Sequence, residues 1–235
     1  MNTRRLLTAT GTVLACAGLV IAGAHRSIAS PVPVSFNLVN DGSFEDQPVT
    51  SGSGFDTYNQ GQTFGGWTVT GGNVDLISTY WTAEDGNQSV DMNGLEPGTI
   101  SQTVNGLNVG QQYQLSFWMA GNTAGGPNVK TLTAGIGSNS FDAVFDDTGK
   151  SPSNMGWTQY SYDFTAANAS ELLSFDSTTT GACEPASPDA ACGPALDNVS
   201  IKAVPEATTL TIFAYMMLTG VVLLIRRRGT VKTAA

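Results

Sequence analysis

The sequence predicts an all-β fold, a sandwich or barrel, for the middle of this chain of 235 residues. Short runs of alternating apolar and polar residues recur between residues 31 and 203. Glycine, asparagine, aspartate and proline separate these runs and supply the turns that antiparallel strands need. No amphipathic pattern is long enough for a helix of three turns. Hydrophobic residues make up 41% of the chain, which is enough for a core and excludes disorder of the whole chain.

Each run is assigned to a strand because alternation with period 2 places one face on a core and the other in solvent. The clearest run spans residues 113–120, and its core face holds Tyr113, Leu115, Phe117 and Met119. Residues 131–136, 159–164 and 199–201 alternate in the same way. Further strands are predicted at Trp67–Thr70, Val74–Ser78, Gln88–Met92, Thr99–Val104, Phe141–Phe145 and Glu171–Asp176. Residues 46–64 contain no predicted strand, and we interpret them as a binding loop or a mobile loop.

The distribution of charge excludes several classes of partner. The net charge is -9, and only Lys130, Lys150 and Lys202 are basic between residues 31 and 204, a stretch that holds 18 of the 19 acidic residues. A nucleic-acid reader needs a basic face, so nucleic acid is not a partner. The single histidine, His25, lies outside the middle, which excludes Ser-His-Asp and Cys-His catalysis and histidine-bound zinc there.

Residues 1–30 predict a signal peptide and therefore export. Arg4 and Arg5 form a charged start, an apolar run follows to Ala24, and small residues near Ala29 offer a cleavage site. Two other interpretations stay open. The segment could remain as an uncleaved membrane anchor, or Cys16 could be acylated as in a lipoprotein.

The C-terminal segment has three parts. Val204, Pro205 and Glu206 come first, an apolar membrane helix is predicted at 208–225, and Arg226–Arg228 follows. Eighteen or so apolar residues can cross a bilayer. The arginine cluster stays on the cytoplasmic side, which leaves the middle domain outside. The alternative is a buried core helix, against which the three arginines argue.

This tail, residues 204–235, resembles the PEP-CTERM sorting signal of Gram-negative bacteria. Ala207 stands where that motif has its second proline. The resemblance implies an exosortase-type membrane protease as a partner, which would cut near Glu206. It implies a protein first anchored in the inner membrane and then placed at the cell surface or in the extracellular matrix.

Cys183 and Cys192 enclose eight residues, and outside the cytoplasm two cysteines this close predict a disulfide. The closed loop is short, so the bond should stabilise the fold by at most ~3 kcal/mol. The alternatives are a redox pair or a metal pair. A metal pair would need two further ligands, and redox pairs are usually closer in sequence.

The two ends of the middle domain carry a family resemblance. Residues 38–45, with Asn-Asp-Gly-Ser-Phe-Glu, open it, and residues 196–201, Leu-Asp-Asn-Val-Ser-Ile, close it. With the motifs between them, residues 37–201 resemble the choice-of-anchor C family. This resemblance implies a galactose-binding-like jelly roll, similar to carbohydrate-binding modules and to plant cell-wall proteins that share the Gly-Ser-Phe-Glu opening. The insert between Cys183 and Cys192 departs from the family pattern.

The resemblance also implies a structural calcium ion near the first and last strands. Its ligands would be Asp41, the carbonyl of Gly42, Glu45 and Asp197. Carboxylates and carbonyls are the oxygen ligands that calcium prefers. The alternative is that Asp41 and Asp197 accept hydrogen bonds from nearby backbone at turns and strand ends. A second acidic pair, Asp146–Asp147, is interpreted as a solvated turn.

Aromatic residues could form a platform for a sugar ring. The predicted carbohydrate-binding residues are Tyr80, Trp81, Trp118 and Asn122, with Gln102 and Asn128 as further polar partners. Tyr80 and Trp81 precede a loop, and Trp118 faces away from the predicted core of its strand. The alternative is that these rings pack in the core, as tryptophan commonly does. Trp67 and Trp157 begin strands and are assigned to the core.

The function predicted from these observations is non-catalytic binding of extracellular polysaccharide by an exported surface or matrix protein. An exposed Trp81 in a concave site would favour this function. A buried Trp81 would favour the main alternative, a structural or adhesive matrix protein without a sugar site. A glycoside hydrolase that uses two carboxyl groups is a further alternative, although no pair stands out in the sequence.

Overall fold

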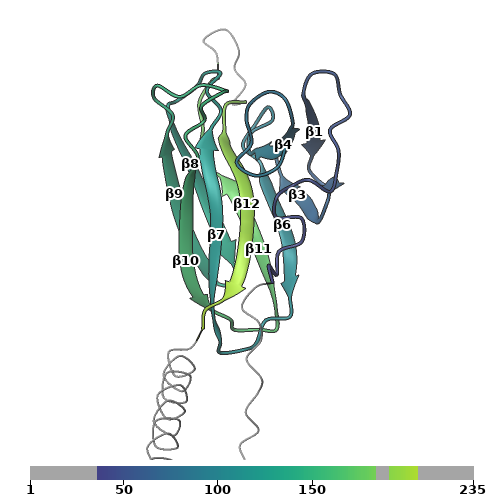
Figure 1. The fold of residues 1–235 in the computed structure, drawn as a ribbon, viewed down its shortest axis with the longest axis vertical. Helices are drawn as coiled ribbons and strands as arrows, with labels where there is room; N and C mark the ends of the chain where they lie inside the picture. Colours follow the sequence, from purple (N-terminus) through teal and green to yellow (C-terminus); the bar gives the residue numbers. More distant parts are fainter. Residues whose placement is uncertain (1–35, 184–190, 206–235) are drawn as a thin grey trace, which may run out of the picture. The chain divides into compact units, whose positions relative to one another are not determined.

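The computed structural model describes residues 36–183 and 191–205. These residues form two antiparallel sheets packed face to face (Figure 1), which confirms the predicted all-β sandwich. The predicted signal peptide at 1–30 and the predicted membrane helix at 208–225 lie outside the described residues. Within the described ranges, no helix has the length and apolar character needed to cross a membrane.

Each sheet has six strands. Sheet A holds, in spatial order, β1 (Phe55–Asn59), β4 (Asn73–Ile77), β5 (Ser89–Asp91), β12 (Pro194–Ala203), β7 (Gln112–Gly121) and β10 (Thr158–Thr165). Sheet B holds β2 (Thr63–Phe64), β3 (Trp67–Gly71), β6 (Thr99–Asn105), β11 (Ser170–Ser177), β8 (Val129–Ile136) and β9 (Asn139–Asp146). Neighbouring strands are often distant in sequence, so the chain crosses repeatedly from one sheet to the other. Every strand predicted from alternation is present.

The core lies between the two sheets and follows the predicted alternation. Along β7 the four residues assigned to the core face are at most 2% exposed. Trp67 is fully buried, with its ring centroid 5.5 Å from that of Phe44 and 5.9 Å from that of Phe175. Burial of a large apolar side chain contributes about 1.5–3 kcal/mol, so this aromatic cluster is a major source of stability. The assignment of Trp67 to the core is confirmed.

The interpretation of residues 46–64 as a loop was wrong, because β1 and β2 lie in this stretch. β1 is an edge strand that pairs with β4, with Phe55 opposite Ile77 and Thr57 opposite Asp75. Its five residues, Phe-Asp-Thr-Tyr-Asn, show no apolar alternation, and its two aromatic residues make separate contacts, Phe55 with Tyr80 and Tyr58 with Phe64. The strand therefore depends on its partner strand, a contact that a local pattern does not encode.

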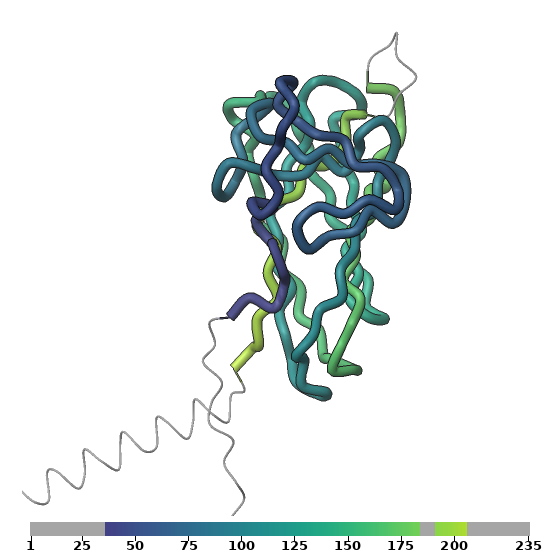
Figure 2. Tube along the Cα trace, turned by 90° about the vertical axis from the view of Figure 1, so that its right-hand side faces the viewer, coloured from purple at the N-terminus to yellow at the C-terminus, as the bar shows by residue number. Residues whose placement is uncertain are grey.

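The opening segment of the domain is bonded to the last strand. The amide of Leu38 donates to the carbonyl of Ile201 at 3.0 Å, and the amide of Val199 donates to the carbonyl of Gly42 at 2.8 Å. The side chain of Asn37 bonds the same strand through the Val199 carbonyl and the Ile201 amide. Figures 1 and 2 accordingly show the opening segment running along β12, and residues 36 and 205 lying at the same end of the sandwich.

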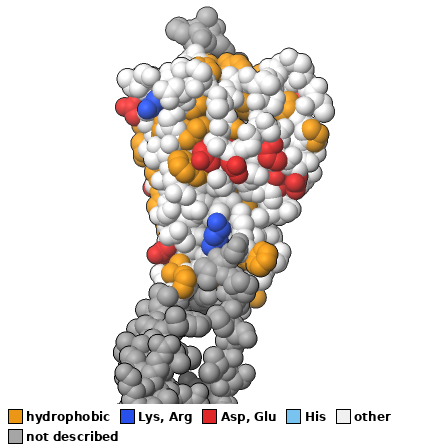
Figure 3. All heavy atoms as spheres, viewed as in Figure 1, with side chains coloured by type: hydrophobic (Ala, Val, Ile, Leu, Met, Phe, Trp, Pro, Cys, Tyr) orange, Lys and Arg blue, Asp and Glu red, His pale blue; other side chains and the backbone are white. Residues whose placement is uncertain are grey.

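The surface of the domain is acidic, as the sequence indicates. In Figure 3, acidic side chains gather across the middle of the face shown and outnumber the basic ones. Lys130 contributes nothing to the surface, because its side chain is fully buried.

We expect the change Gly42→Ala to lower the free energy of unfolding by about 1–3 kcal/mol, the usual cost of forcing an extra methyl group into packed structure. An added Cβ at Gly42 would lie 2.1 Å from the carbonyl oxygen of Val199. Urea denaturation of the purified protein measures the change. The control is Gly52→Ala, where a Cβ would meet no atom within 4 Å. Equal stability of the two variants would contradict the expected clash.

Candidate functional site

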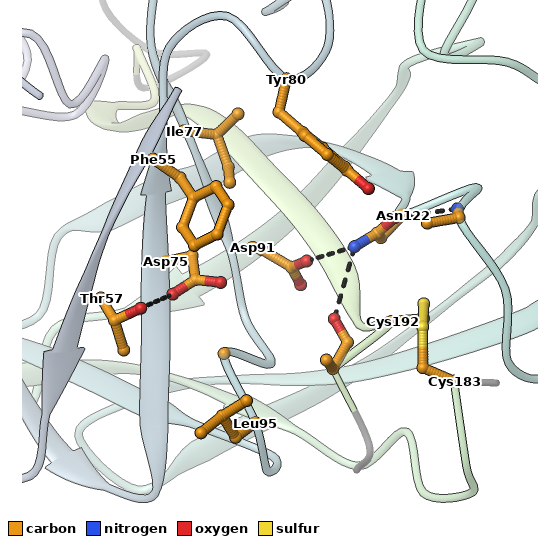
Figure 4. Close-up of a pocket in the computed structure, with 13 residues that line it drawn as sticks. Phe55, Thr57, Asp75, Ile77, Tyr80, Asp91, Leu95, Asn122, Cys183 and Cys192 are labelled. Atoms are coloured by element: carbon orange, nitrogen blue, oxygen red, sulfur yellow. Dashed lines mark hydrogen bonds between the residues drawn. A yellow bond between two sulfur atoms is a disulfide. The ribbon is translucent and has the colours of Figure 1, made fainter. Parts of the chain in front are cut away.

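A pocket of about 260 Å³ lies over the outer face of sheet A (Figure 4). Strands β1, β4 and β5 supply its floor, because strand pairing places Thr57 beside Asp75 and Asp75 beside Asp91 on the same face. Alternation along β4 directs Val74 and Leu76 into the core, while Asp75 and Ile77 lie on the opposite face and line the pocket. The pocket is therefore a direct product of strand register.

Asp75 and Asp91 form the polar centre of the pocket. Asp75 is 9% exposed, and its Oδ1 accepts a hydrogen bond from the Thr57 hydroxyl at 2.5 Å. Asp91 is 1% exposed and accepts hydrogen bonds from the Asn93 amide at 3.0 Å and from Asn122 Nδ2 at 2.7 Å. Burial raises the pKa of both carboxyls, and the pKa of Asp91 lies well above its usual range.

The sides of the pocket are apolar. The ring of Tyr80 is 43% exposed and meets the ring of Phe55 edge-on, at a centroid distance of 6.1 Å. Leu95, 59% exposed, lies across the pocket from Tyr80 (Figure 4). The pocket thus combines acidic and amide groups at its centre with an exposed aromatic ring at its side.

A disulfide forms another side of the pocket. Cys183 and Cys192 are bonded, as predicted, with their Cα atoms 5.1 Å apart, and both line the pocket. Asn122 reaches this side through its Nδ2, which also lies 3.4 Å from the carbonyl oxygen of Ala191. The insert that departs from the family pattern therefore contributes to the site.

The buried Lys130 joins the segments that carry the pocket residues. Its Nζ donates to the carbonyl of Cys192 at 2.9 Å and to that of Gly125 at 3.1 Å, and it lies 3.4 Å from Asp147 Oδ2. Burial lowers the pKa of Lys130, and the charge of Asp147 opposes that shift. Because Asp147 pairs with a buried lysine, the interpretation of Asp146–Asp147 as a solvated turn was wrong for Asp147. Asp146 does hold a turn, through the amide and hydroxyl of Thr148.

Among the predicted sugar-binding residues, Tyr80 and Asn122 line the pocket. Trp81 does not offer a ring face, because it is 5% exposed and its Nε1 donates to the Ser89 hydroxyl at 2.8 Å. Its assignment to an exposed platform was therefore wrong. Trp118 is half-buried on β7 and does not line the pocket. Of the adjacent residues Tyr80 and Trp81, the first is exposed and the second is buried. Sequence alone does not say which of two adjacent aromatic side chains faces solvent.

The further polar residues predicted to bind sugar, Gln102 and Asn128, do not line the pocket, and neither does Trp157. Gln102 binds the backbone of Asn40 through both its amide oxygen and its amide nitrogen. Asn128 donates to the Thr148 hydroxyl at 3.1 Å. Trp157 packs partly against the core, and its Nε1 donates to the carbonyl of Thr82 at 3.0 Å.

The four residues expected to bind calcium mostly accept hydrogen bonds from backbone amides, so calcium binding stays a prediction. Glu45 Oε1 accepts hydrogen bonds from the amides of Asn87 and Gln88, and Asp197 Oδ2 accepts from the amides of Glu84 and Asp85. The carbonyl of Gly42 accepts from Val199, and Asp41 Oδ1 accepts from the amide of Asp46. These oxygens face N–H donors, whereas Asp41 Oδ2 is buried and accepts no hydrogen bond from the described residues. Across residues 36–183 and 191–205, no three His, Cys, Asp or Glu side chains form a group that could hold a metal ion.

The two carboxylates instead hold the loop that follows Tyr80. Residues 84–88 contribute four backbone amides, two to Asp197 and two to Glu45, at distances of 2.6–3.0 Å. Hydrogen bonds from amides to a carboxylate are stronger than those between neutral groups. The residues that the family resemblance singled out thus support the site without lining it.

Sequence analysis missed Phe55, Thr57, Asp75 and Asp91 as site residues. A signal for the two aspartates was present. Each interrupts an otherwise apolar strand, in Val-Asp-Leu and Val-Asp-Met, with its side chain on the outer face. An acidic residue at such a position indicates a polar site over the sheet.

We expect the free energy of unfolding to fall as the pH rises from about 5 to about 7.5. Asp197 is fully buried, and burial raises its pKa from 3.8 to about 7 against the opposing hydrogen bonds from Asp85, Asn198 and Glu84. The folded state therefore holds this proton more tightly than the unfolded state does. The stability that this provides is complete below about pH 3.8 and is lost as the pH rises through about 7, by at most about 4 kcal/mol.

Urea denaturation at several pH values measures this change. The variant Asp197→Asn cannot ionise at this position, so its profile should be flatter than that of the wild-type protein over the same range. A wild-type stability that increases between about pH 5 and about pH 7.5 would contradict the raised pKa.

Comparison with known proteins shows the following similarities. The family model described as a protein of unknown function, DUF642, matches residues 37–202. Halomucin from Haloquadratum walsbyi is 36% identical over 168 residues, which are 70% of this chain and 2% of that protein. The chain thus spans a very small part of this curated relative.

Two solved structures are among those with detectable similarity to this chain. The CBM22-1 xylan-binding domain from Paenibacillus barcinonensis is 19% identical, with a TM-score of 0.42 over 75% of this chain and 99% of that one. A family 35 carbohydrate binding module from Clostridium thermocellum is 15% identical, with a TM-score of 0.40 over 62% of this chain and 97% of that one. From the match over residues 37–202, the chain belongs to the DUF642 family.

Proposed function

We propose that the protein binds polysaccharide without catalysis and that the pocket over sheet A is its sugar site. One observation carries this proposal. A single pocket places two carboxyl groups and the Asn122 amide beside the exposed ring of Tyr80. A pyranose ring has hydroxyl groups that bond carboxylates and amides, and it has a C–H face that packs on an aromatic ring. Ligand pockets in proteins combine apolar walls with a few fixed polar groups in this way.

The polar groups of the pocket are fixed before a ligand arrives. Asp91 and Asn122 hold each other through a bond of 2.7 Å, and Asp75 is held by Thr57. Groups that are already ordered lose little conformational entropy on binding. The volume of about 260 Å³ is close to the lower end of ordinary ligand pockets, about 300 Å³, so the pocket suits one short part of a glycan chain.

We also propose that the protein is exported and works at the cell surface or in the extracellular matrix. Residues 1–30 support this as a signal peptide, and residues 204–235 support it as a sorting tail with a membrane helix and an exosortase-type protease as partner. Val204 and Pro205 are the last described residues, and the amide of Val204 donates to the carbonyl of Gln112 at 2.9 Å. The last strand, β12, ends at Ala203, before the predicted sorting motif at Val204, Pro205 and Glu206.

A structural or adhesive matrix protein without a sugar site is the second candidate function. The burial of Trp81 favours it, because the most prominent predicted platform residue is part of the core. Polysaccharide binding distinguishes the two functions directly. The position of Asp75 beside Asp91 also makes release of reducing ends a necessary control, since a glycoside hydrolase uses two carboxyl groups.

We expect the purified protein to be retarded in native gels that contain its polysaccharide, tested with a panel of neutral, acidic and amino polymers. Tyr80→Ala should weaken this binding about tenfold, which corresponds to about 1.4 kcal/mol, because it removes the exposed ring. The control is Phe36→Ala, which removes a ring that is 73% exposed and does not line the pocket. Retardation that persists unchanged in Tyr80→Ala would move the site elsewhere. A folded protein that no polymer retards would favour the structural function.

The proposed sorting predicts a mature protein that lacks the residues after about Glu206. Mass spectrometry of the protein from its native host measures this. A mature mass that still includes Arg226–Arg228 would make the tail a permanent anchor.

A further inference from the structure

We propose that the pocket selects a sugar that carries a free amino group, such as an unacetylated 2-amino hexose within a polysaccharide. This inference rests on the proposed function, because it names the sugar class for the same pocket. The amino group, protonated as an ammonium, would lie against Asp75, and the C–H face of the sugar would lie against Tyr80.

The first support is the charge of the pocket. Asp75 and Asp91 are side by side in register, and no Lys, Arg or His is among the described residues that line the pocket. Lys130 does not line the pocket, and its ammonium is held by two carbonyls and by Asp147. The charge of Lys130 acts on Asp91, but no cation among the described residues acts on Asp75, so burial makes the charged form of Asp75 costly. A cationic ligand would offset this cost.

The second support is the open oxygen of Asp75. Its side chain is nine-tenths buried, and its Oδ1 is bonded to Thr57, but its Oδ2 accepts no hydrogen bond from residues 36–183 or 191–205. Figure 4 shows this oxygen directed into the pocket, on the side of Asp91. This oxygen has no donor from the described protein residues and opens into the pocket, so it is available to a ligand. An ammonium supplies both the donor and the opposite charge.

Asp91 has a different role. One of its oxygens accepts from the Asn93 amide and the other from Asn122, so both are already engaged. It holds the Asn122 amide at the floor of the pocket and does not compete with Asp75 for the ligand. The ring of Tyr80 adds a second feature that favours a cation, because the face of an aromatic ring attracts positive charge.

The same features discriminate between sugars. A hydroxyl in place of the amino group could bond Asp75 but would not compensate its charge. An N-acetyl group removes the charge and adds bulk in a pocket of about 260 Å³. A uronic acid would bring a third carboxylate close to two others. The expected order of affinity is therefore amino first, neutral second and acidic last.

Three β-1,4-linked oligosaccharides of equal length test this, because they differ only at carbon 2. They are oligomers of glucosamine, of N-acetylglucosamine and of glucose. Calorimetric titration of the full-length protein at about pH 6 keeps the amine protonated. We expect the glucosamine oligomer to bind about tenfold more tightly than the glucose oligomer, a difference of about 1.4 kcal/mol.

A pair of matched variants separates the pocket from the general acidity of the protein. Asp75→Asn removes one charge in the pocket and should abolish the preference for the amine while the glucose oligomer still binds. The control is Asp176→Asn, because Asp176 also accepts a threonine hydroxyl, from Thr99 at 2.6 Å, but is exposed on sheet B. This control should keep the full preference.

Each outcome decides the matter. Equal binding of the glucosamine and glucose oligomers, with both weakened by Tyr80→Ala, would overturn the amino-sugar inference and leave the proposed function standing. A preference that persists in Asp75→Asn would also overturn it. Absence of binding to any carbohydrate would overturn both proposals.

If thermal melting shows that Asp75→Asn is unfolded, competition on the wild-type protein decides instead. Free glucosamine should displace a bound glucosamine oligomer at about one tenth of the concentration of glucose that is needed. Equal concentrations of the two monosaccharides would overturn the inference.

Discussion

The site depends on the insertion of the last strand, β12, between β5 and β7. In this strand Ala195 pairs with Asp91 on one side, and Pro194 pairs with Gly121 on the other. Asp91 and Asn122 are 31 residues apart in sequence, and β12 brings them within hydrogen-bond distance. The opening segment is in turn bonded to β12, so the strand that completes the pocket also joins the two ends of the domain. A pocket built in this way cannot form from any one part of the chain.

The carboxyl groups at these two ends accept hydrogen bonds from backbone amides. Glu45 from the opening segment and Asp197 from β12 hold the loop at residues 84–88. Four amides of this loop donate to oxygens of these two side chains, and a calcium site would need the same oxygens as ligands. Glu45 and Asp197, which suggested a calcium ion in the sequence, thus bind backbone N–H groups in this structure. The same residue types at the same positions are compatible with both, so sequence could not separate them.

Most of the fold could be predicted because alternation reports directly on burial, as along β7. Edge strand β1 could not, because its residues depend on pairing with β4. In the site, Tyr80 and Asn122 were predicted from their residue types. Trp81 was placed wrongly because the direction of a side chain at a turn depends on tertiary contacts, here its bond to Ser89. The pairing of Asp75 with Asp91 required strand register, which follows from the turn and sheet geometry rather than from either strand alone.

The way in which the opening segment lies on β12 has a mechanical consequence. As the residue number rises from 38 to 42, the partner on β12 falls from 201 to 199, so the two segments are antiparallel and their free ends leave the sandwich together. Tension applied through those ends would load the hydrogen bonds one at a time, in an unzipping geometry. This geometry resists force less than shear along two paired strands does. Stretching a chain of such domains would therefore release the opening segment first, and with it the hold of Glu45 on the loop beside the pocket.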